Sequence, residues 1–306
     1  MNAAAPALEF DHTLRSVVLG TGAIGAVSGA LGSFAYLRRQ SLVGDVVAHS
    51  SLLGIVGAFL LGYLLTGTGS RSLWVLVPGA VAAGVAALLL SRAVTSRTRL
   101  SEDAGLGVML ALFFGGGVLL LRWAQRHQPV IPGHTGLDAY LFGSAAALTT
   151  TDLWMISSVG LAALFVMLLL WRRLEVYTFD PLFAHSLGIP VRRLEAVLRV
   201  LLVTGVVVGI HAVGVVLMIA LLATPASAAR QWTRHLGTMV ALSSLFGAVS
   251  AALGTVISAR YAHLPAGPVI VLVATAVFLV SLACAPRRGL LSRMRRRVRS
   301  VEVAGA

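Results

Sequence analysis

Long apolar runs dominate this chain, and short polar segments, most of them containing arginine, separate them. An α-helix needs about 20 mostly apolar residues to cross the hydrocarbon core of a bilayer. We therefore predict an all-α fold, a polytopic transmembrane helical bundle of about nine spans. The predicted spans cover approximately residues 14–36, 44–65, 73–90, 106–121, 153–171, 197–210, 213–227, 237–257 and 267–283.

The predicted spans form a single domain. We expect residues 1–13 to be a polar lead, residues 14–285 the transmembrane domain, and residues 286–306 a basic cytoplasmic tail. Residues 197–229 form a mostly apolar run that is too long for one span and short for two. We divide this run in its middle, around Gly209, His211 and Gly214, so that one span ends at residue 210 and the next begins at residue 213. An eight-span description stays open because interrupted spans are common in transporters.

Composition and charge support a membrane protein. Of 306 residues, 58% are hydrophobic and 11% are charged, and the mean hydropathy is +0.90, whereas soluble domains carry about a quarter charged residues. All 24 basic residues are arginine. With nine spans and an outside N-terminus, nineteen of them lie in inside loops or the tail. This positive-inside pattern predicts a cytoplasmic C-terminus. It also argues against the interpretation that the net positive charge serves to bind nucleic acid.

Two ionisable residues, Asp45 and His49, lie in the second predicted span. They are four positions apart and therefore share one face of a helix. Either residue alone is more often structural, as a helix cap or a packing residue. The pair favours a metal or ion pathway, because ionisable groups within a membrane commonly mark function. Gly54, Ala58 and Gly62 form a small-residue stripe on the same span that allows close packing or gating.

The longest polar connection, residues 172–196, carries the signals of a short capped helix. Aspartate is a good helix cap, proline suits the first helical position, and glycine ends a helix. Flanking arginine pairs and defined ends favour a cytoplasmic docking element over an ordinary basic loop. The residues of this predicted docking element are Asp180, Pro181, Ala184, His185 and Gly188.

Three ordered segments resemble the membrane permeases of ATP-binding-cassette (ABC) importers for manganese, zinc and iron. Residues 41–50, SLVGDVVAHS, are similar to the SL.GDA.AHS signature of that family. Residues 214–230, which include Thr224 and Pro225, and residues 264–273 resemble two further family segments. The resemblance extends over roughly residues 14 to 285 and implies the fold of a type II ABC importer permease.

The resemblance implies a permease subunit in the plasma membrane of a prokaryote. It would move a divalent transition metal ion, manganese, zinc or iron, into the cytoplasm, and it would hold no permanent cofactor. The implied partners are a second copy of the chain, two cytoplasmic ATPase subunits that dock on residues 172–196, an extracytoplasmic metal-binding protein, and membrane lipid. The sequence contains no Walker-type phosphate loop, so we expect no ATPase activity in this chain itself.

Asp45 and His49 are the metal ligands that we predict. Carboxylate and imidazole without thiolate suit Mn²⁺, Fe²⁺ and Zn²⁺ alike, so the sequence does not choose among these metals. A homodimer would bring two copies of each ligand to a shared axis. His211, at the break in the apolar run, ranks second as a ligand, and Thr224 and Pro225 are assigned to packing or gating.

Two other transporter classes remain as alternatives. A secondary transporter driven by an ion gradient would also use an intramembrane Asp45 and His49, but it would not need a docking helix. A permease for a chelated metal or a corrinoid shares the architecture, but it would require a wide apolar path without paired ligands.

Overall fold

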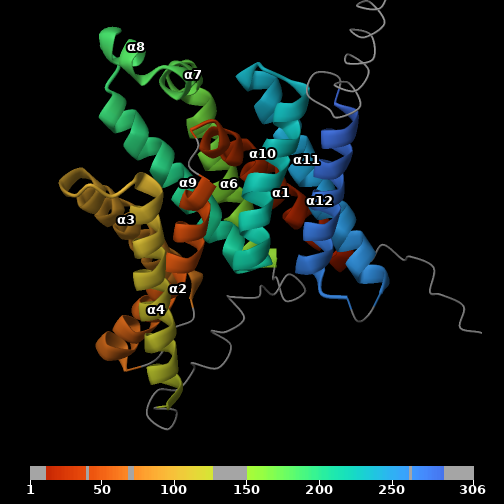
Figure 1. The fold of residues 1–306 in the computed structure, drawn as a ribbon. Helices are drawn as coiled ribbons and strands as arrows, with labels where there is room; N and C mark the ends of the chain where they lie inside the picture. Colours follow the sequence, from red (N-terminus) through yellow and green to blue (C-terminus); the bar gives the residue numbers. More distant parts are fainter. Residues whose placement is uncertain (1–11, 39–40, 68–71, 127–149, 262–263, 286–306) are drawn as a thin grey trace, which may run out of the picture.

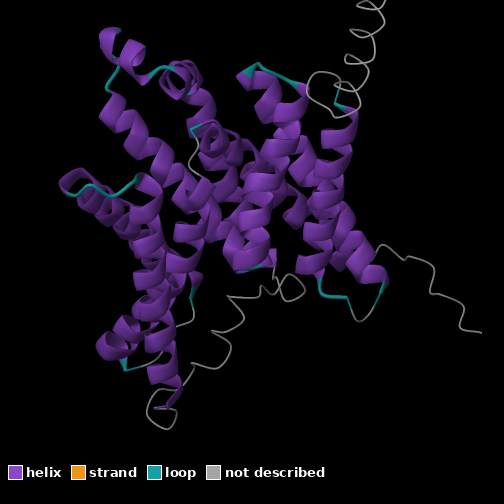
Figure 2. Ribbon diagram, in the orientation of Figure 1, coloured by secondary structure: helices purple, strands orange, loops and turns teal. Residues whose placement is uncertain are grey.

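The computed structural model describes residues 12–38, 41–67, 72–126, 150–261 and 264–285, and this part of the chain contains helices and no strands (Figures 1 and 2). The helices are α1 (His12–Leu37), α2 (Ser41–Thr66), α3 (Leu73–Arg97), α4 (Glu102–Arg126), α6 (Thr150–Leu169), α7 (Trp171–Phe179), α8 (Pro181–Ser186), α9 (Val191–Val213), α10 (Val215–Trp232), α11 (Leu236–Arg260) and α12 (Ala266–Cys284). The all-helical prediction is confirmed for these residues. The polar lead, most of the connection before α6, and the basic tail lie outside them.

Every predicted span corresponds to a helix, but the count of nine spans is not confirmed. Within the described residues, seven helices are long and apolar enough to cross a membrane, and the bent pair of α6 and α7 raises this number to eight. α6 and α7 meet at an angle of 72°. α9 is not among the described helices that meet these criteria, and Arg192, Arg193 and Glu195 lie in its first turns.

Small residues allow the closest helix contacts in the bundle. α1 and α11 pack together over Gly25 and Gly247, whose backbones face each other without intervening side chains. One turn along α1, the hydroxyl of Ser243 donates a hydrogen bond of 2.6 Å to the carbonyl of Gly29. Such approaches between small residues are a common basis of helix packing in membranes.

The long apolar run is broken within the segment that the sequence predicted, but at Gly214 and not between residues 210 and 213. α9 ends at Val213 and α10 begins at Val215, with Gly214 between them at φ +84°. A positive φ is readily adopted only by glycine, so Gly214 permits the change of direction. The Gly214 N–H still donates to the carbonyl of Ile210 at 2.8 Å, which caps the end of α9.

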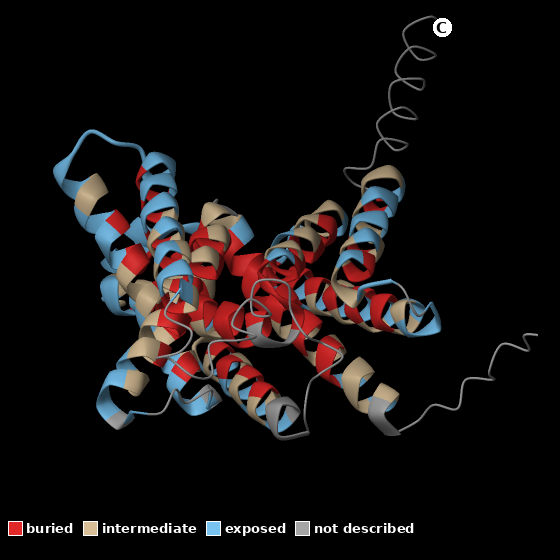
Figure 3. Ribbon diagram, turned by 90° about the horizontal axis from the view of Figure 1, so that it is seen from below, coloured by how far each residue is buried: buried red, intermediate tan, exposed pale blue. Residues whose placement is uncertain are grey.

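Buried residues gather toward the middle of the bundle, and exposed residues lie on its outer faces (Figure 3). The core includes Phe34, Val46, Phe59 and Leu202, which come from α1, α2 and α9. Many outward-facing side chains are also large and apolar, such as Leu168 of α6. Extensive exposed apolar surface marks contact with lipid or with another chain, as expected for a transmembrane bundle.

Candidate functional site

Asp45 and His49 lie in the first turns of α2, on one face of the helix. Both side chains are partly buried, and the two groups are close enough to interact electrostatically. The imidazole ring of His49 packs edge-on against Phe114 of α4, with 4.9 Å between the ring centroids and 71° between the planes. The structure therefore brings the two predicted ligands together between α2 and α4.

The Nδ1 atom of His49 is buried and makes no hydrogen bond to any other described residue. Buried polar atoms in folded proteins nearly always have a partner, so each exception requires an explanation. In the neutral tautomer that carries its proton on Nε2, the Nδ1 atom has a lone pair that can bind a metal ion. The state of this atom fits a ligand better than a histidine whose only role is packing.

Ser50 and Ser51, which follow His49, do not compete with it as ligands for an ion. The hydroxyls of Ser50 and Ser51 donate to the carbonyls of Val47 and Ala48 at 3.1 and 2.6 Å. Both serines are fully buried and are thus satisfied within their own helix. Asp45 and His49 remain the polar groups on this part of α2 that are available to an ion.

One chain supplies an incomplete metal site as far as the structure describes it. No three residues among the described His, Cys, Asp and Glu lie close enough together to hold a metal ion. His211 occupies the last turn of α9, and its side chain is outside the described residues, so its role as a ligand is untested. Two ligands are too few for tetrahedral or octahedral coordination.

The predicted capped helix exists as α8. The carboxylate of Asp180 accepts hydrogen bonds from the N–H groups of Leu182 and Phe183 at 3.0 and 2.9 Å, and Pro181 occupies the first helical position. Gly188 follows the helix with φ +74°. Ala184 is buried, and His185 is exposed.

The outer surface of α8 is apolar. Leu182 has an exposed fraction of 84%, and Phe183 and Leu187 are also exposed. The helix lies at one end of the molecule, away from the centre of the bundle (Figure 1). Three exposed apolar side chains on a short capped helix form a contact surface suited to another protein.

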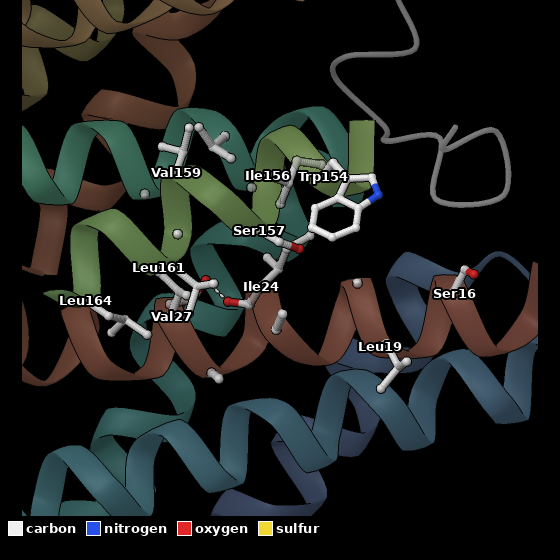
Figure 4. A pocket seen from close by; sticks show the side chains of 18 residues that line it. Ser16, Leu19, Ile24, Val27, Trp154, Ile156, Ser157, Val159, Leu161 and Leu164 are labelled. Atoms are coloured by element: carbon white, nitrogen blue, oxygen red, sulfur yellow. Dashed lines mark hydrogen bonds between the residues drawn. The ribbon is translucent and has the colours of Figure 1, made fainter. Parts of the chain in front are cut away.

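A cavity of about 530 Å³ lies between α1, α6 and α9. Figure 4 shows Ser157 and Leu161 of α6 facing Ile24 and Val27 of α1. Its walls are almost entirely apolar, and neither Asp45 nor His49 contributes to them. Because carboxylates and imidazoles are missing from its lining, this cavity does not resemble a site for a metal ion.

Comparisons with known proteins identify the family of the chain. Residues 10–285 match the ABC 3 transport family. The chain belongs to this family. It is 43% identical over 289 residues to the zinc transport system membrane protein TroC of Treponema pallidum, with 94% of each chain covered. It is also 40% identical over 303 residues to the manganese transport system membrane protein MntC of Bacillus subtilis, with 97% of this chain and 68% of the relative covered.

A solved structure agrees with this assignment. PsaBC from Streptococcus pneumoniae, determined in complex with a Fab, contains a chain that superposes on this ABC 3 family chain with a TM-score of 0.78. The two chains are 31% identical, and the match covers 90% of this chain and 93% of that one. The family resemblance expected from the sequence segments is thus confirmed.

The residues predicted to serve packing or gating in this ABC 3 family chain lie on two helices, α2 and α10, and do not share one environment. Pro225 lies buried within α10, and the carbonyl of Thr224 accepts a hydrogen bond from Ser227 at 2.9 Å. Gly54 and Ala58 of α2 contact Gly79 and its neighbour in α3, whereas a Cβ atom at Gly62 would meet no described atom within 4 Å. Close packing therefore involves the first two residues of the predicted stripe.

Sequence reasoning missed α7 and the polar contacts around it. The sequence prediction ends a span at residue 171 and begins a polar connection at residue 172, yet residues 171–179 form a helix with Leu174 and Tyr177 fully buried. Nearby, Glu195 of α9 binds both Arg199 and Arg92 at 2.5 and 3.0 Å. The spacing of Glu195 and Arg199 was a detectable signal. The contact with Arg92, which comes from α3, was not.

Proposed function

We propose that this chain is the transmembrane permease subunit of an ABC importer that moves Mn²⁺ or Zn²⁺ into the cytoplasm. The observation that carries the proposal is the pair of Asp45 and His49 with its unpartnered buried Nδ1 atom, in a chain of the ABC 3 transport family. Relatives named for zinc and for manganese transport support these two ions. Fe²⁺ fits the same ligand chemistry and belongs in the test.

In this proposal, Asp45 compensates the charge of the ion and His49 supplies a nitrogen ligand. A two-fold homodimer completes the site, because each chain offers only two ligands within its described residues. A transit site must bind an ion well enough to admit it and weakly enough to release it. A small set of oxygen and nitrogen ligands without thiolate meets this requirement.

The energy comes from partner subunits in this proposal. Two cytoplasmic ATPases dock on α8, whose exposed Leu182 and Phe183 supply an apolar contact. An extracytoplasmic metal-binding protein delivers the ion at the opposite face. This arrangement places the chain in a prokaryotic plasma membrane, in contact with lipid. A docking element of this kind has no evident use in a secondary transporter, so the ABC importer is favoured.

The test is metal uptake into proteoliposomes that contain this chain with its ATPase and its metal-binding protein. Uptake of Mn²⁺, Zn²⁺ and Fe²⁺ is compared for wild type, Asp45→Asn and His49→Gln. Asp45→Asn removes the charge and His49→Gln removes the imidazole ring, and each variant keeps approximately the size of the original side chain. We expect ATP-dependent uptake of one preferred ion, which falls at least about tenfold in each variant, a typical effect of changes at metal sites.

Matched controls separate the site from general effects of charge. Asp103 and His235 are exposed residues at the beginnings of α4 and α11, and Asp103→Asn and His235→Gln should transport as wild type does. Normal uptake by both Asp45→Asn and His49→Gln would contradict the proposed site. Uptake that follows a proton gradient without ATP would instead support a secondary transporter.

A further inference from the structure

Arg38 contacts the helix that precedes the docking element. It directly follows α1, and α2 begins shortly after it at Ser41. Its guanidinium carbon lies 4.3 Å from the centre of the Tyr177 ring, and its Nη1 atom donates a hydrogen bond of 3.3 Å to the Tyr177 carbonyl. Arg38 thus holds Tyr177 by its ring face and by its backbone, an arrangement that suits the planar guanidinium of arginine.

α7 is fixed to α1 at a second point. The rings of Trp171 and Phe34 meet edge-on, with centroids 6.0 Å apart. Trp171 begins α7 and Tyr177 lies in its last turn, so the two contacts hold both ends of the helix. Tyr177 and Phe34 are fully buried. Both ends of α7 are therefore held against the end of α1 and the residue that follows it.

The other charges near Tyr177 bind one another. Arg38, Glu195, Arg199 and Arg92 all act electrostatically on the Tyr177 phenol. The carboxylate of Glu195 binds Arg199 and Arg92, whereas the side chain of Arg38 contacts Tyr177. Glu195 and Arg92 thus join α9 to α3, and Arg38 joins α7 to the end of α1, shortly before α2 begins.

The contact is extended in two directions along the chain. Toward the docking surface, Asp180 alone separates α7 from α8, and the Ala184 N–H donates to the Asp180 carbonyl at 3.0 Å. Toward the proposed site, α2 begins at Ser41, shortly after Arg38, and it packs tightly against α4, where a Cβ atom at Gly117 would lie 2.8 Å from the Leu53 nitrogen. Packed helices of this kind shift as units rather than deform.

We propose that Arg38 is a positioning residue that transmits movement of α8 through Tyr177 to α2, and thereby to Asp45 and His49. This inference rests on the proposed function, since it assumes ATPase docking on α8 and metal transit at the pair. It assigns Arg38 no contact with the metal ion. Coupling between distant sites requires contiguous packed or hydrogen-bonded groups. Arg38 supplies the contact between α7 and the part of the chain between α1 and α2.

The experiment measures the number of metal ions moved per ATP hydrolysed in proteoliposomes that contain the full transporter. Arg38→Gln should assemble with the ATPase, bind the preferred metal ion and hydrolyse ATP at the wild-type rate. Its ratio of transport to hydrolysis should fall about fivefold or more, within the usual range of coupling between sites. Arg97→Gln is the matched control, because Arg97 is an exposed arginine on α3 that lies outside residues 172–196, and it should keep the wild-type ratio.

A pair of Tyr177 variants tests the same contact independently. Tyr177→Phe keeps the ring face and the backbone carbonyl that Arg38 binds and should keep the wild-type ratio. Tyr177→Leu removes the ring face and should lower the ratio as Arg38→Gln does. If Arg38→Gln does not assemble, this pair still decides the question, since the two variants differ in the aromatic face.

The outcomes distinguish this inference from the function on which it rests. A wild-type ratio in Arg38→Gln or in Tyr177→Leu overturns the role of Arg38 alone, and so does an equal loss in Tyr177→Phe and Tyr177→Leu. A wild-type complex that hydrolyses ATP but moves no metal overturns the proposed function, and the inference with it. A lowered ratio in Arg38→Gln and Tyr177→Leu, with a normal ratio in Arg97→Gln and Tyr177→Phe, supports the role of Arg38.

Discussion

At the scale of single residues, the positions of α2 that lack side chains determine how closely its neighbours approach. A Cβ atom at Gly54 would lie 2.6 Å from the Ala80 Cα atom and still closer to the Gly79 carbonyl. A Cβ atom at Gly57, three positions later, would meet no described atom within 4 Å. The same helix therefore offers one glycine that packing requires and one that it does not.

We predict opposite effects of alanine at these two positions. Gly54→Ala should destabilise the protein by about 1–3 kcal/mol, the usual cost of excess volume in a packed interior. Gly57→Ala should raise stability by up to about 1 kcal/mol, because alanine is the better helix former. The thermal unfolding midpoint of the purified chain in detergent measures both effects. An unchanged midpoint for Gly54→Ala would show that α2 and α3 can separate at no cost.

The two site residues could be predicted because their chemistry conflicts with their surroundings. A carboxylate and an imidazole one turn apart in an apolar run are visible in the sequence alone. The partner of the His49 ring, Phe114, lies on another helix, and nothing in the spacing of either helix indicates this contact. The same reason hid the contact between Arg38 and Tyr177, whose partners are 139 positions apart.

At the scale of elements, α8 depends on its cap more than a longer helix would. It has six residues, and isolated helices this short are unstable without support. Asp180 satisfies two N–H groups in its first turn. The shape of the exposed surface formed by Leu182 and Phe183 thus rests on one carboxylate.

We predict that Asp180→Ala weakens binding of the partner ATPase, whereas Asp180→Asn preserves it. Loss of a helix cap costs about 1 kcal/mol, which corresponds to about fivefold in an equilibrium constant. Asparagine keeps an oxygen that accepts the same hydrogen bonds. The dissociation constant of the ATPase for the detergent-solubilised chain is the measurement. Equal binding by the alanine variant would mean that α8 keeps its shape without the cap or does not contact the ATPase.

The elements that the sequence predicted best are those with local signals. The cap of α8 and the break at Gly214 both depend on residue types within a few positions, and both are present. α7 was missed because its arginines resemble a solvated loop, while burial of Tyr177 is decided by contact with α1. The number of spans does not follow from local signals in the same way. α9 begins with charged residues, which argue against a span, and continues as a long apolar run, which argues for one.

At the scale of the whole molecule, the structure relates the docking surface to the end of the described chain. α8 and the end of α12 lie at the same end of the bundle (Figure 1). Cys284, the single cysteine of the chain, is exposed at that position. If α8 meets cytoplasmic ATPases, Cys284 must also be cytoplasmic, whether the bundle has eight spans or nine.

We predict that a membrane-impermeant thiol reagent leaves Cys284 unlabelled in intact cells with a single plasma membrane and labels it in inverted vesicles. The control is Tyr261→Cys in a Cys284→Ala background, because Tyr261 is exposed where α11 ends at the opposite face. This variant should show the reverse pattern. Labelling of Cys284 from outside would reverse the orientation and remove α8 from reach of an ATPase.

The apolar surface of α8 also has a consequence for biogenesis. Before a partner covers it, Leu182, Phe183 and Leu187 lie exposed, and surfaces of this kind invite aggregation and engage the chaperones and proteases that dispose of incomplete proteins. If the ATPase covers this surface as proposed, a newly inserted chain is vulnerable until that subunit binds. Balanced synthesis of the two subunits would then protect this chain, and permease made in excess of the ATPase would be degraded by the cell.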